Sequence, residues 1–340
     1  MRMYANFSLQ NRTEDKLIRH SGTIVILRTI LLGLITVAII FSNIINMWIL
    51  RKVRELQTLG KVLLINLSVA DFINGFFVCL PAVLASACDR WLLGTTYCTV
   101  SCILHGITCT VSIWCLAIVS LDRYIAINFP VRYRNAKKMY YSIGILIAVW
   151  LFSLITFLSP HIFDSKYYGY QETIVMCGMK WKSVIFCIAT GLYIPILSAA
   201  VIFFSSYKVS KALLAIQQAK TNRRGQVKCS RDLKAIRMLK ISTICYIAAW
   251  GPYTLIAYLK AFNVFTDVPE EVEFTVAWLA NSNSFMNVII YSGHLDGFLR
   301  QLKKNFSCCM CSRCCKDNAV YPDVREDSNL PSTITQTNIY

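Results

Sequence analysis

Seven runs of mainly apolar residues divide this chain, and each is long enough to cross a lipid bilayer. A helix needs about 20 such residues to span the hydrocarbon core. The composition agrees, because 56% of the 340 residues are hydrophobic and 16% are charged, with a mean hydropathy of +0.50. Ordinary soluble domains are less apolar. The sequence predicts an all-α membrane protein with spans over residues 24–50, 60–84, 97–122, 141–161, 183–206, 238–261 and 273–293.

The segments outside these spans are short, and none is long enough for a separate soluble domain. We expect an extracellular tail over residues 1–23 and a bundle of seven transmembrane helices over 24–293. A short amphipathic helix is expected next over 294–306, with its body at Leu295–Asn305. A cytoplasmic tail over 307–340 completes the predicted organisation.

Loop charges predict the orientation in the membrane. Basic residues crowd the first, third and fifth loops, over 51–61, 132–138 and 208–237, and such loops stay in the cytoplasm. The amino-terminal tail is then extracellular, where its two glycan acceptor sequences, at Asn6 and Asn11, could be used. The net charge of +17 therefore indicates a surface facing anionic membrane lipids and a partner protein, and no nucleic acid is expected.

The fifteen cysteines divide by compartment. Cys98 and Cys177 both face the oxidising exterior and could pair, but Cys88 is a third candidate on that side, so the residues alone leave the pairing open. A second group follows the last span, and zinc binding there is one reading. No histidine accompanies the group, and its place after a basic amphipathic segment favours reversible palmitoylation, at Cys308, Cys309 and Cys311.

One carboxylate, Asp71, lies in the middle of the second span. At that depth it has to be paired, protonated or bound to a cation. The third and seventh spans offer polar side chains at a comparable depth. Interhelical hydrogen bonds are the ordinary reading of a single such residue, but an aligned set favours a functional polar core that could hold a sodium ion, formed by Asp71, Ser112, Asn283, Ser284 and Asn287.

The third span ends in Asp122-Arg123-Tyr124. Charges are expensive in hydrocarbon, so this group is either a solvated boundary marker or a functional switch. In the sixth span Pro252 removes a backbone hydrogen bond, which lets the segment pivot. Asp232 lies twenty residues earlier, roughly 30 Å by helical rise, and thus level with Arg123. We expect the two to pair when the helix is closed, although a solvated carboxylate is an equal alternative.

Taken in order, these features resemble the rhodopsin-like (class A) G-protein-coupled receptors over residues 24–306. The resemblance implies a disulfide between Cys98 and Cys177 and a heterotrimeric G protein as partner. It also implies arrestin and receptor kinases as partners, a place in the plasma membrane and an extracellular ligand whose identity stays open. The matching motifs are Asn43, Leu67–Asp71, Asp122–Tyr124, Trp150, Pro195, Trp250–Tyr253 and Asn287–Tyr291.

The same resemblance assigns roles to individual residues. Coupling to the G protein would use Asp122, Arg123, Tyr124, Pro130, Val131, Asp232 and Tyr291. Tyr246, Trp250 and Pro252 would form the toggle of the sixth helix. The upper cavity would be lined by His105, Cys109, Trp250, Tyr253, Trp278 and Asn281.

Departures from the family pattern are informative. Val288 replaces the usual proline of the seventh-helix motif, and Phe203 and Tyr246 replace a tyrosine and a phenylalanine. His105 occupies the position of the aspartate of aminergic receptors, so no carboxylate there can pair with an amine. Asn281 occupies the position of the opsin lysine, which rules out a Schiff base to retinal at that residue.

Two stretches resemble a group of orphan receptors with high basal signalling through the stimulatory G protein: Val111–Ala117 with the following Asp122–Tyr124, and Trp278–Ala280 with Ser282–Phe285. In that group the second extracellular loop enters the ligand site, and Met176, Met179 and Trp181 could act so here. The alternative is a peptide- or lipid-activated receptor coupled to an inhibitory or calcium-mobilising G protein. A transporter is a distant alternative, because no internal repeat is visible, and no catalytic grouping suggests an enzyme.

Overall fold

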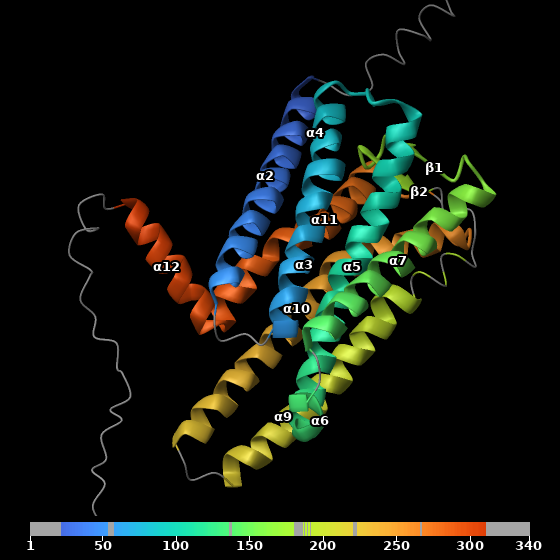
Figure 1. The fold of residues 1–340 in the computed structure, drawn as a ribbon. Coiled ribbons are helices and arrows are strands. Elements are labelled where there is room, and N and C mark those ends of the chain that lie inside the picture. The colour runs from blue at the N-terminus through green and yellow to red at the C-terminus, as the bar shows by residue number, and fades with distance from the viewer. Residues whose placement is uncertain are drawn as a thin grey trace, which may run out of the picture. The chain divides into compact units, whose positions relative to one another are not determined.

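The computed structural model describes residues 22–53, 58–135, 138–179, 186, 188, 190, 192–219, 223–265 and 267–310. The chain divides into two compact units, Met1–Gln301 and Leu302–Tyr340. The first unit contains the membrane helices and is built almost entirely of helix (Figure 1). The boundary between the units falls within the last described helix, α12, over Asp296–Met310, at the place where the sequence predicts an amphipathic helix.

Over its described residues every expected span is helical, and most of the helices run beyond the predicted limits. The second and fifth spans each contain a short π-helical segment, Gly75–Cys79 and Leu192–Leu197. Pro195 lies in the latter and Pro81 just after the former, and a proline leaves a gap in the hydrogen-bond ladder that a wider turn can absorb. The helices are α2 (Gly22–Lys52), α3 (Thr58–Asn74), α4 (Leu80–Ala87), α5 (Gly94–Asn128), α6 (Pro130–Asn135), α7 (Lys138–Phe163), α9 (Ser198–Ala219), α10 (Arg223–Ala261) and α11 (Glu270–His294).

Helix α5 is central to the bundle, packing against α3, α7, α9 and α10 (Figure 1). Its approach to α7 is close, because a Cβ atom added at Gly106 would lie 2.2 Å from a ring carbon of Phe157. Only glycine fits there without displacing the ring. The bundle closes through α11, which packs against both α10 and α2.

Five helices in the described part of the chain are long and apolar enough to cross a membrane: Gly22–Lys52, Leu59–Ala87, Gly94–Asn128, Tyr140–Phe163 and Ile194–Ala215. Helices α10 and α11 fall short of that composition. In α11 the polar residues Asn281, Ser284 and Asn287 are buried between helices, so they lower the mean hydropathy without facing lipid. In α10 the tyrosine, tryptophan, serine and threonine residues likewise lower the mean hydropathy.

The loop between α7 and the fifth span forms an antiparallel hairpin that the sequence does not predict, of strands β1 (Tyr168–Gln171) and β2 (Met176–Met179). Tyr170 pairs with Cys177 in the register of the two strands. The turn between them places Val175 at φ 55°, a region that glycine or asparagine usually occupies. A valine there removes the usual sequence signal of a hairpin.

Candidate functional site

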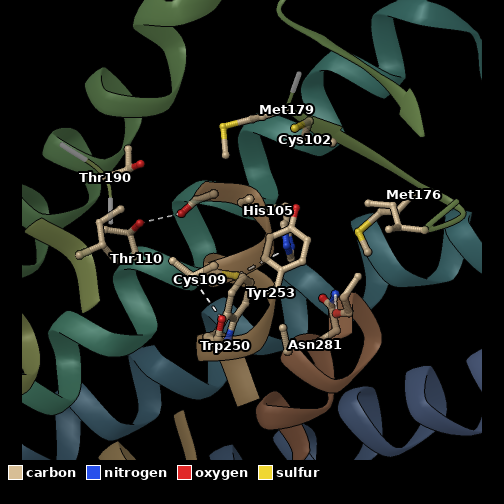
Figure 2. Close-up of a pocket in the computed structure, with 18 of the residues that line it drawn as sticks. Cys102, His105, Cys109, Thr110, Met176, Met179, Thr190, Trp250, Tyr253 and Asn281 are labelled. Atoms are coloured by element: carbon tan, nitrogen blue, oxygen red, sulfur yellow. Dashed lines mark hydrogen bonds between the residues drawn. The ribbon is translucent and has the colours of Figure 1, made fainter. Parts of the chain in front are cut away.

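A cavity lies between α5, α10 and α11, and strand β2 forms part of its wall (Figure 2). The cavity has a volume of about 120 Å³, so it leaves room for a small molecule only. Figure 2 shows side chains from different elements facing this space, with Met179 at its top and Trp250 at its base. Five of the six residues that the sequence assigns to the cavity line it: His105, Cys109, Trp250, Tyr253 and Asn281.

The sixth assignment, Trp278, is wrong, because this residue lies outside the lining of the cavity. Its side chain is 2% exposed and packs in an apolar core with Leu32 and Val78. The indole Nε1 donates a hydrogen bond to the backbone oxygen of Ile174, at 2.9 Å. Trp278 therefore supports the hairpin from α11 and satisfies its buried N–H there.

The disulfide predicted from the family resemblance is present, linking Cys98 of α5 to Cys177 of β2. Cys88, the competing candidate, is free and exposed. The disulfide fixes β2 above the cavity, and Met176 and Met179 on either side of Cys177 line it. The hairpin is thus tied to the bundle next to the residues predicted to bind a ligand.

Further contacts hold the hairpin against the helices. Thr173 Oγ1, in its turn, donates to Glu273 Oε2 of α11 at 3.0 Å, and Glu273 also forms an ion pair with Lys260 of α10. At the other end, Tyr168 donates its hydroxyl to the Phe157 oxygen at 2.5 Å. Burial raises the pKa of Tyr168 above its usual value, which keeps that hydroxyl protonated. The sequence does not indicate this pair, because Glu273 and Lys260 are 13 residues apart and only the structure shows that Glu273 is buried.

At the base of the cavity a chain of three side chains crosses the bundle. Asn281 Nδ2 donates to the Ala277 oxygen at 2.9 Å, and Asn281 Oδ1 accepts from Asn74 Nδ2 at 3.3 Å. Asn74 Oδ1 in turn lies 2.8 Å from His105 Nδ1. Asn74 was missed by sequence reasoning, although it is a polar residue one helical turn after Asp71 in an otherwise apolar run.

Deeper in the bundle, three donors converge on the Asp71 carboxylate. Ser112 and Ser284 donate to Oδ1 at 2.9 and 3.1 Å, and Asn287 donates to Oδ2 at 2.9 Å. All four residues are buried. The fifth residue of the predicted set, Asn283, is only half-buried and donates no hydrogen bond to Asp71 among the described side chains. The oxygen atoms of this group, from two hydroxyls and a carboxylate, are ligands that suit a hard cation such as sodium.

Trp250 stands between the cavity and the core. Its ring centroid lies 5.9 Å from that of Tyr246 and 6.1 Å from that of Tyr253, with the first pair stacked. His105 is 5.7 Å away on α5. Pro252 follows two residues later inside α10, so the aromatic group sits next to a point where the helix lacks a backbone donor.

At the other end of α5, Arg123 forms an ion pair with its neighbour Asp122, and its Nε donates to Asp122 Oδ2 at 3.1 Å. Arg123 Nη2 also lies 3.5 Å from the hydroxyl oxygen of Tyr133 in α6. Burial, and then the charge of Asp122, raise the pKa of Tyr133 above its usual value. Of the other residues assigned to coupling, Tyr124 is half-buried, Pro130 and Val131 are exposed, and Tyr291 is fully buried against Phe298.

Several predicted residues lie outside the described part of the chain. Asn6, Asn11, Trp181 and Cys311 are among them. Asp232, Cys308 and Cys309 fall within α10 and α12, but their side chains are not described. The predicted contact between Asp232 and Arg123 therefore stays a prediction.

Comparison with known proteins shows the family of this chain. The profile of the family described as 7 transmembrane receptor (rhodopsin family) matches residues 42–291, which is well over half of the chain. The chain belongs to this family. The membership confirms the resemblance stated from the motifs, and it agrees with the expectation that the chain is a receptor and no enzyme.

Relatives of this chain include several receptor types. The alpha-1A adrenergic receptor of Mus musculus is 26% identical over 302 residues, covering 78% of this receptor, which in turn spans 65% of that protein's length. The histamine H2 receptor of Cavia porcellus is 27% identical over 292 residues (83% and 79% covered). The somatostatin receptor type 4 of Rattus norvegicus is 25% identical over 300 residues (83% and 74%).

The crystal structure of squid rhodopsin superposes with a TM-score of 0.75 over 93% of this receptor and 95% of that chain. Its sequence identity is 20%, so this similarity concerns the fold alone. It confirms the predicted fold class, a bundle of seven transmembrane helices.

Proposed function

We propose that this receptor passes an extracellular signal to a heterotrimeric G protein of the stimulatory type and that its own hairpin supplies part of that signal. Family membership supports the general role, because the matched family is one of transmembrane receptors. The orientation predicted from loop charges places the hairpin outside the cell and Arg123 at the cytoplasmic face. We therefore place the receptor in the plasma membrane, where the hairpin would meet extracellular ligands.

One observation carries the proposal of self-activation. The disulfide from Cys98 to Cys177 tethers β2 so that Met176 and Met179 line the same cavity as Trp250. A tethered segment acts at a high effective concentration, so weak contacts keep it in place most of the time. In a bundle with two states, a segment bound in this way favours the state that it fits better.

Cells expressing the receptor without added ligand test this function. We expect cyclic AMP to rise with receptor number at the cell surface. A receptor that is silent in this assay but lowers forskolin-raised cyclic AMP, or releases calcium, would overturn the stimulatory assignment. That result would favour the second candidate, a ligand-activated receptor of another coupling type, which is supported by the space left in the cavity beside the hairpin.

The remaining partners and modifications are part of the same proposal. Arrestin and receptor kinases would act on the cytoplasmic side, where anionic membrane lipids would face the basic loops. Glycans at Asn6 and Asn11 would lie outside the cell, and palmitoyl groups at Cys308, Cys309 and Cys311 would anchor the segment after the last span. The Asp71 cluster would hold an allosteric sodium ion.

Replacing Val131 by alanine should weaken coupling to the G protein. Val131 is 66% exposed in the short helix α6, the helix whose Tyr133 hydroxyl lies near Arg123, and we propose that it inserts into an apolar pocket of the partner. Loss of two methyl-sized groups that are buried at a protein interface costs about 1.6 kcal/mol, or about fifteenfold in affinity. G-protein titration of receptor-stimulated nucleotide exchange measures this shift, and an unchanged midpoint would remove Val131 from the interface.

Replacing Asp232 by alanine should raise basal nucleotide exchange. If Asp232 pairs with Arg123 in the inactive state, a partly solvated pair contributes about 1 kcal/mol, so the increase should be no more than about fivefold. The comparison is made at matched surface expression. A fall, or no change, would show that Asp232 is simply solvated.

A further inference from the structure

His105 has a defined hydrogen-bonding state, set by a backbone group two helices away. The Ala277 carbonyl oxygen can only accept, so the group of Asn281 that faces it at 2.9 Å must be the amide NH₂ group, Nδ2. The opposite atom, Asn281 Oδ1, is therefore an acceptor, and it takes a hydrogen bond from Asn74 Nδ2 at 3.3 Å. A flipped amide at either asparagine would bring two oxygens together.

The same logic reaches the imidazole. With its Nδ2 directed to α11, Asn74 presents Oδ1 to His105, and this oxygen can only accept. The proton of His105 is then on Nδ1, at 2.8 Å from Asn74 Oδ1, with the sulfur of Cys109 at 3.8 Å as a weak second neighbour. In a neutral ring the other nitrogen, Nε2, carries a free lone pair.

His105 is part of the cavity wall, so this lone pair is the ring's remaining hydrogen-bonding group there. His105 is half-buried and lines the cavity, and no described residue donates a hydrogen bond to Nε2. The hairpin side chains that line the cavity nearby, Met176 and Met179, have thioethers that cannot donate.

The surroundings favour a neutral imidazole and a neutral ligand. None of the described residues that line the cavity carries a charge. A protonated His105 would therefore place a cation among apolar and aromatic groups without an anionic partner. A cationic ligand would meet the same penalty, whereas a largely apolar molecule would replace water at the walls.

Resting on the proposal that this cavity is the ligand site, we propose that it selects a neutral, mainly apolar molecule with one hydroxyl or N–H group that donates to His105 Nε2. Asn74 and Asn281 are the positioning residues that fix the tautomer. The described hairpin side chains at the cavity, Met176 and Met179, fill apolar space but supply no donor. Such a molecule would therefore bind beside them and donate the hydrogen bond that they cannot.

The tautomer is tested first and needs no ligand. Nitrogen-15 NMR of the full-length receptor labelled at its four histidines should show one ring with a proton on Nδ1 and none on Nε2, and His105→Phe should remove that signal. Asn74→Leu deletes the acceptor and should shift the ring toward a mixture of tautomers. A proton on Nε2 of His105 in the unmodified receptor would overturn the inference.

The ligand class is tested with three probes of one shape: 4-phenylphenol, its isostere 4-methylbiphenyl, which lacks the donor, and the biphenyl-4-ylmethylammonium cation. Saturation-transfer NMR titrations use the purified full-length receptor. We expect the phenol to bind about tenfold more tightly than 4-methylbiphenyl, and the cation no more tightly than 4-methylbiphenyl. His105→Phe should abolish the preference for the phenol, whereas the matched control His161→Phe, outside the cavity lining, should retain it.

The inference fails if the phenol does not bind, if it binds no better than 4-methylbiphenyl, if its advantage survives in His105→Phe, or if the cation binds most tightly. These measurements involve no G protein. A receptor that keeps the preference for the phenol but shows no ligand-free cyclic AMP would leave this inference standing while removing the proposed self-activation. Detergent takes up each probe equally in all samples, so it does not affect the comparison of affinities between receptor variants.

Discussion

Replacing Met176 and Met179 together by serine should lower ligand-free cyclic AMP by about tenfold. Met176 is buried and Met179 half-buried where β2 meets the cavity. Full burial of one such side chain contributes about 1.5–3 kcal/mol. If about 1.4 kcal/mol of this total favours the active state, its loss changes the ratio of states tenfold. The measurement is cyclic AMP per receptor at the cell surface.

The matched control for this variant is Lys166→Ser, which alters an exposed residue of the same loop outside the cavity lining. It should leave basal cyclic AMP unchanged. The disulfide to Cys98 stays in both variants, so the hairpin remains attached to α5. Equal basal output from the double variant and the control would show that the hairpin is only a cover for the cavity.

Much of the fold could be predicted because its signals are local. Apolar runs of bilayer length gave the seven spans, and the motifs gave their order. The family resemblance placed His105, Trp250 and Asn281 around one cavity, and all three line it in the structure. The polar content of α11 shows the limit, because residues such as Ser284 face the protein interior and weaken the hydropathy of a true span.

The hairpin and its supports could not be predicted from local pattern. Its turn puts Val175 at a positive φ, held by tertiary contacts rather than by a glycine. The indole of Trp278 packs behind the cavity because the hairpin offers it the Ile174 oxygen. Without the Ile174 oxygen, the indole N–H of Trp278 would need another hydrogen-bond acceptor. Trp278 was therefore assigned wrongly because the hairpin that binds its indole was not predicted.

Asn74 was missed for a different reason. A single asparagine in an apolar helix usually forms a structural hydrogen bond, and nothing in the sequence states which partner it has. Its role depends on Asn281 and His105, which are 207 and 31 residues away in the chain. Only the three-dimensional arrangement shows that one backbone carbonyl, that of Ala277, orients both amides.

The Asp71 cluster leads to the second large effect. Its carboxylate is held by the side chains of Ser112, Ser284 and Asn287, and Asn43 fixes the Ser284 backbone through a 3.0 Å hydrogen bond from α2. Four helical segments thus meet at one buried acid. Serine hydroxyls can rotate to present oxygen lone pairs to an ion, so a sodium ion would replace hydrogen bonds by coordination and neutralise the charge.

Replacing Asp71 by asparagine should abolish the dependence of basal nucleotide exchange on sodium. In the family that the chain resembles the ion favours the inactive state, so sodium should suppress exchange in the unmodified receptor but not in the variant, which has lost the charge that binds the ion. Exchange is compared in sodium chloride and choline chloride at equal ionic strength, which holds screening constant. Ser282→Ala, whose hydroxyl donates only to the Leu279 oxygen of its own helix, should respond as the unmodified receptor does. Sodium suppression that persists in a well-expressed Asp71→Asn receptor would place the ion, if any, at another site.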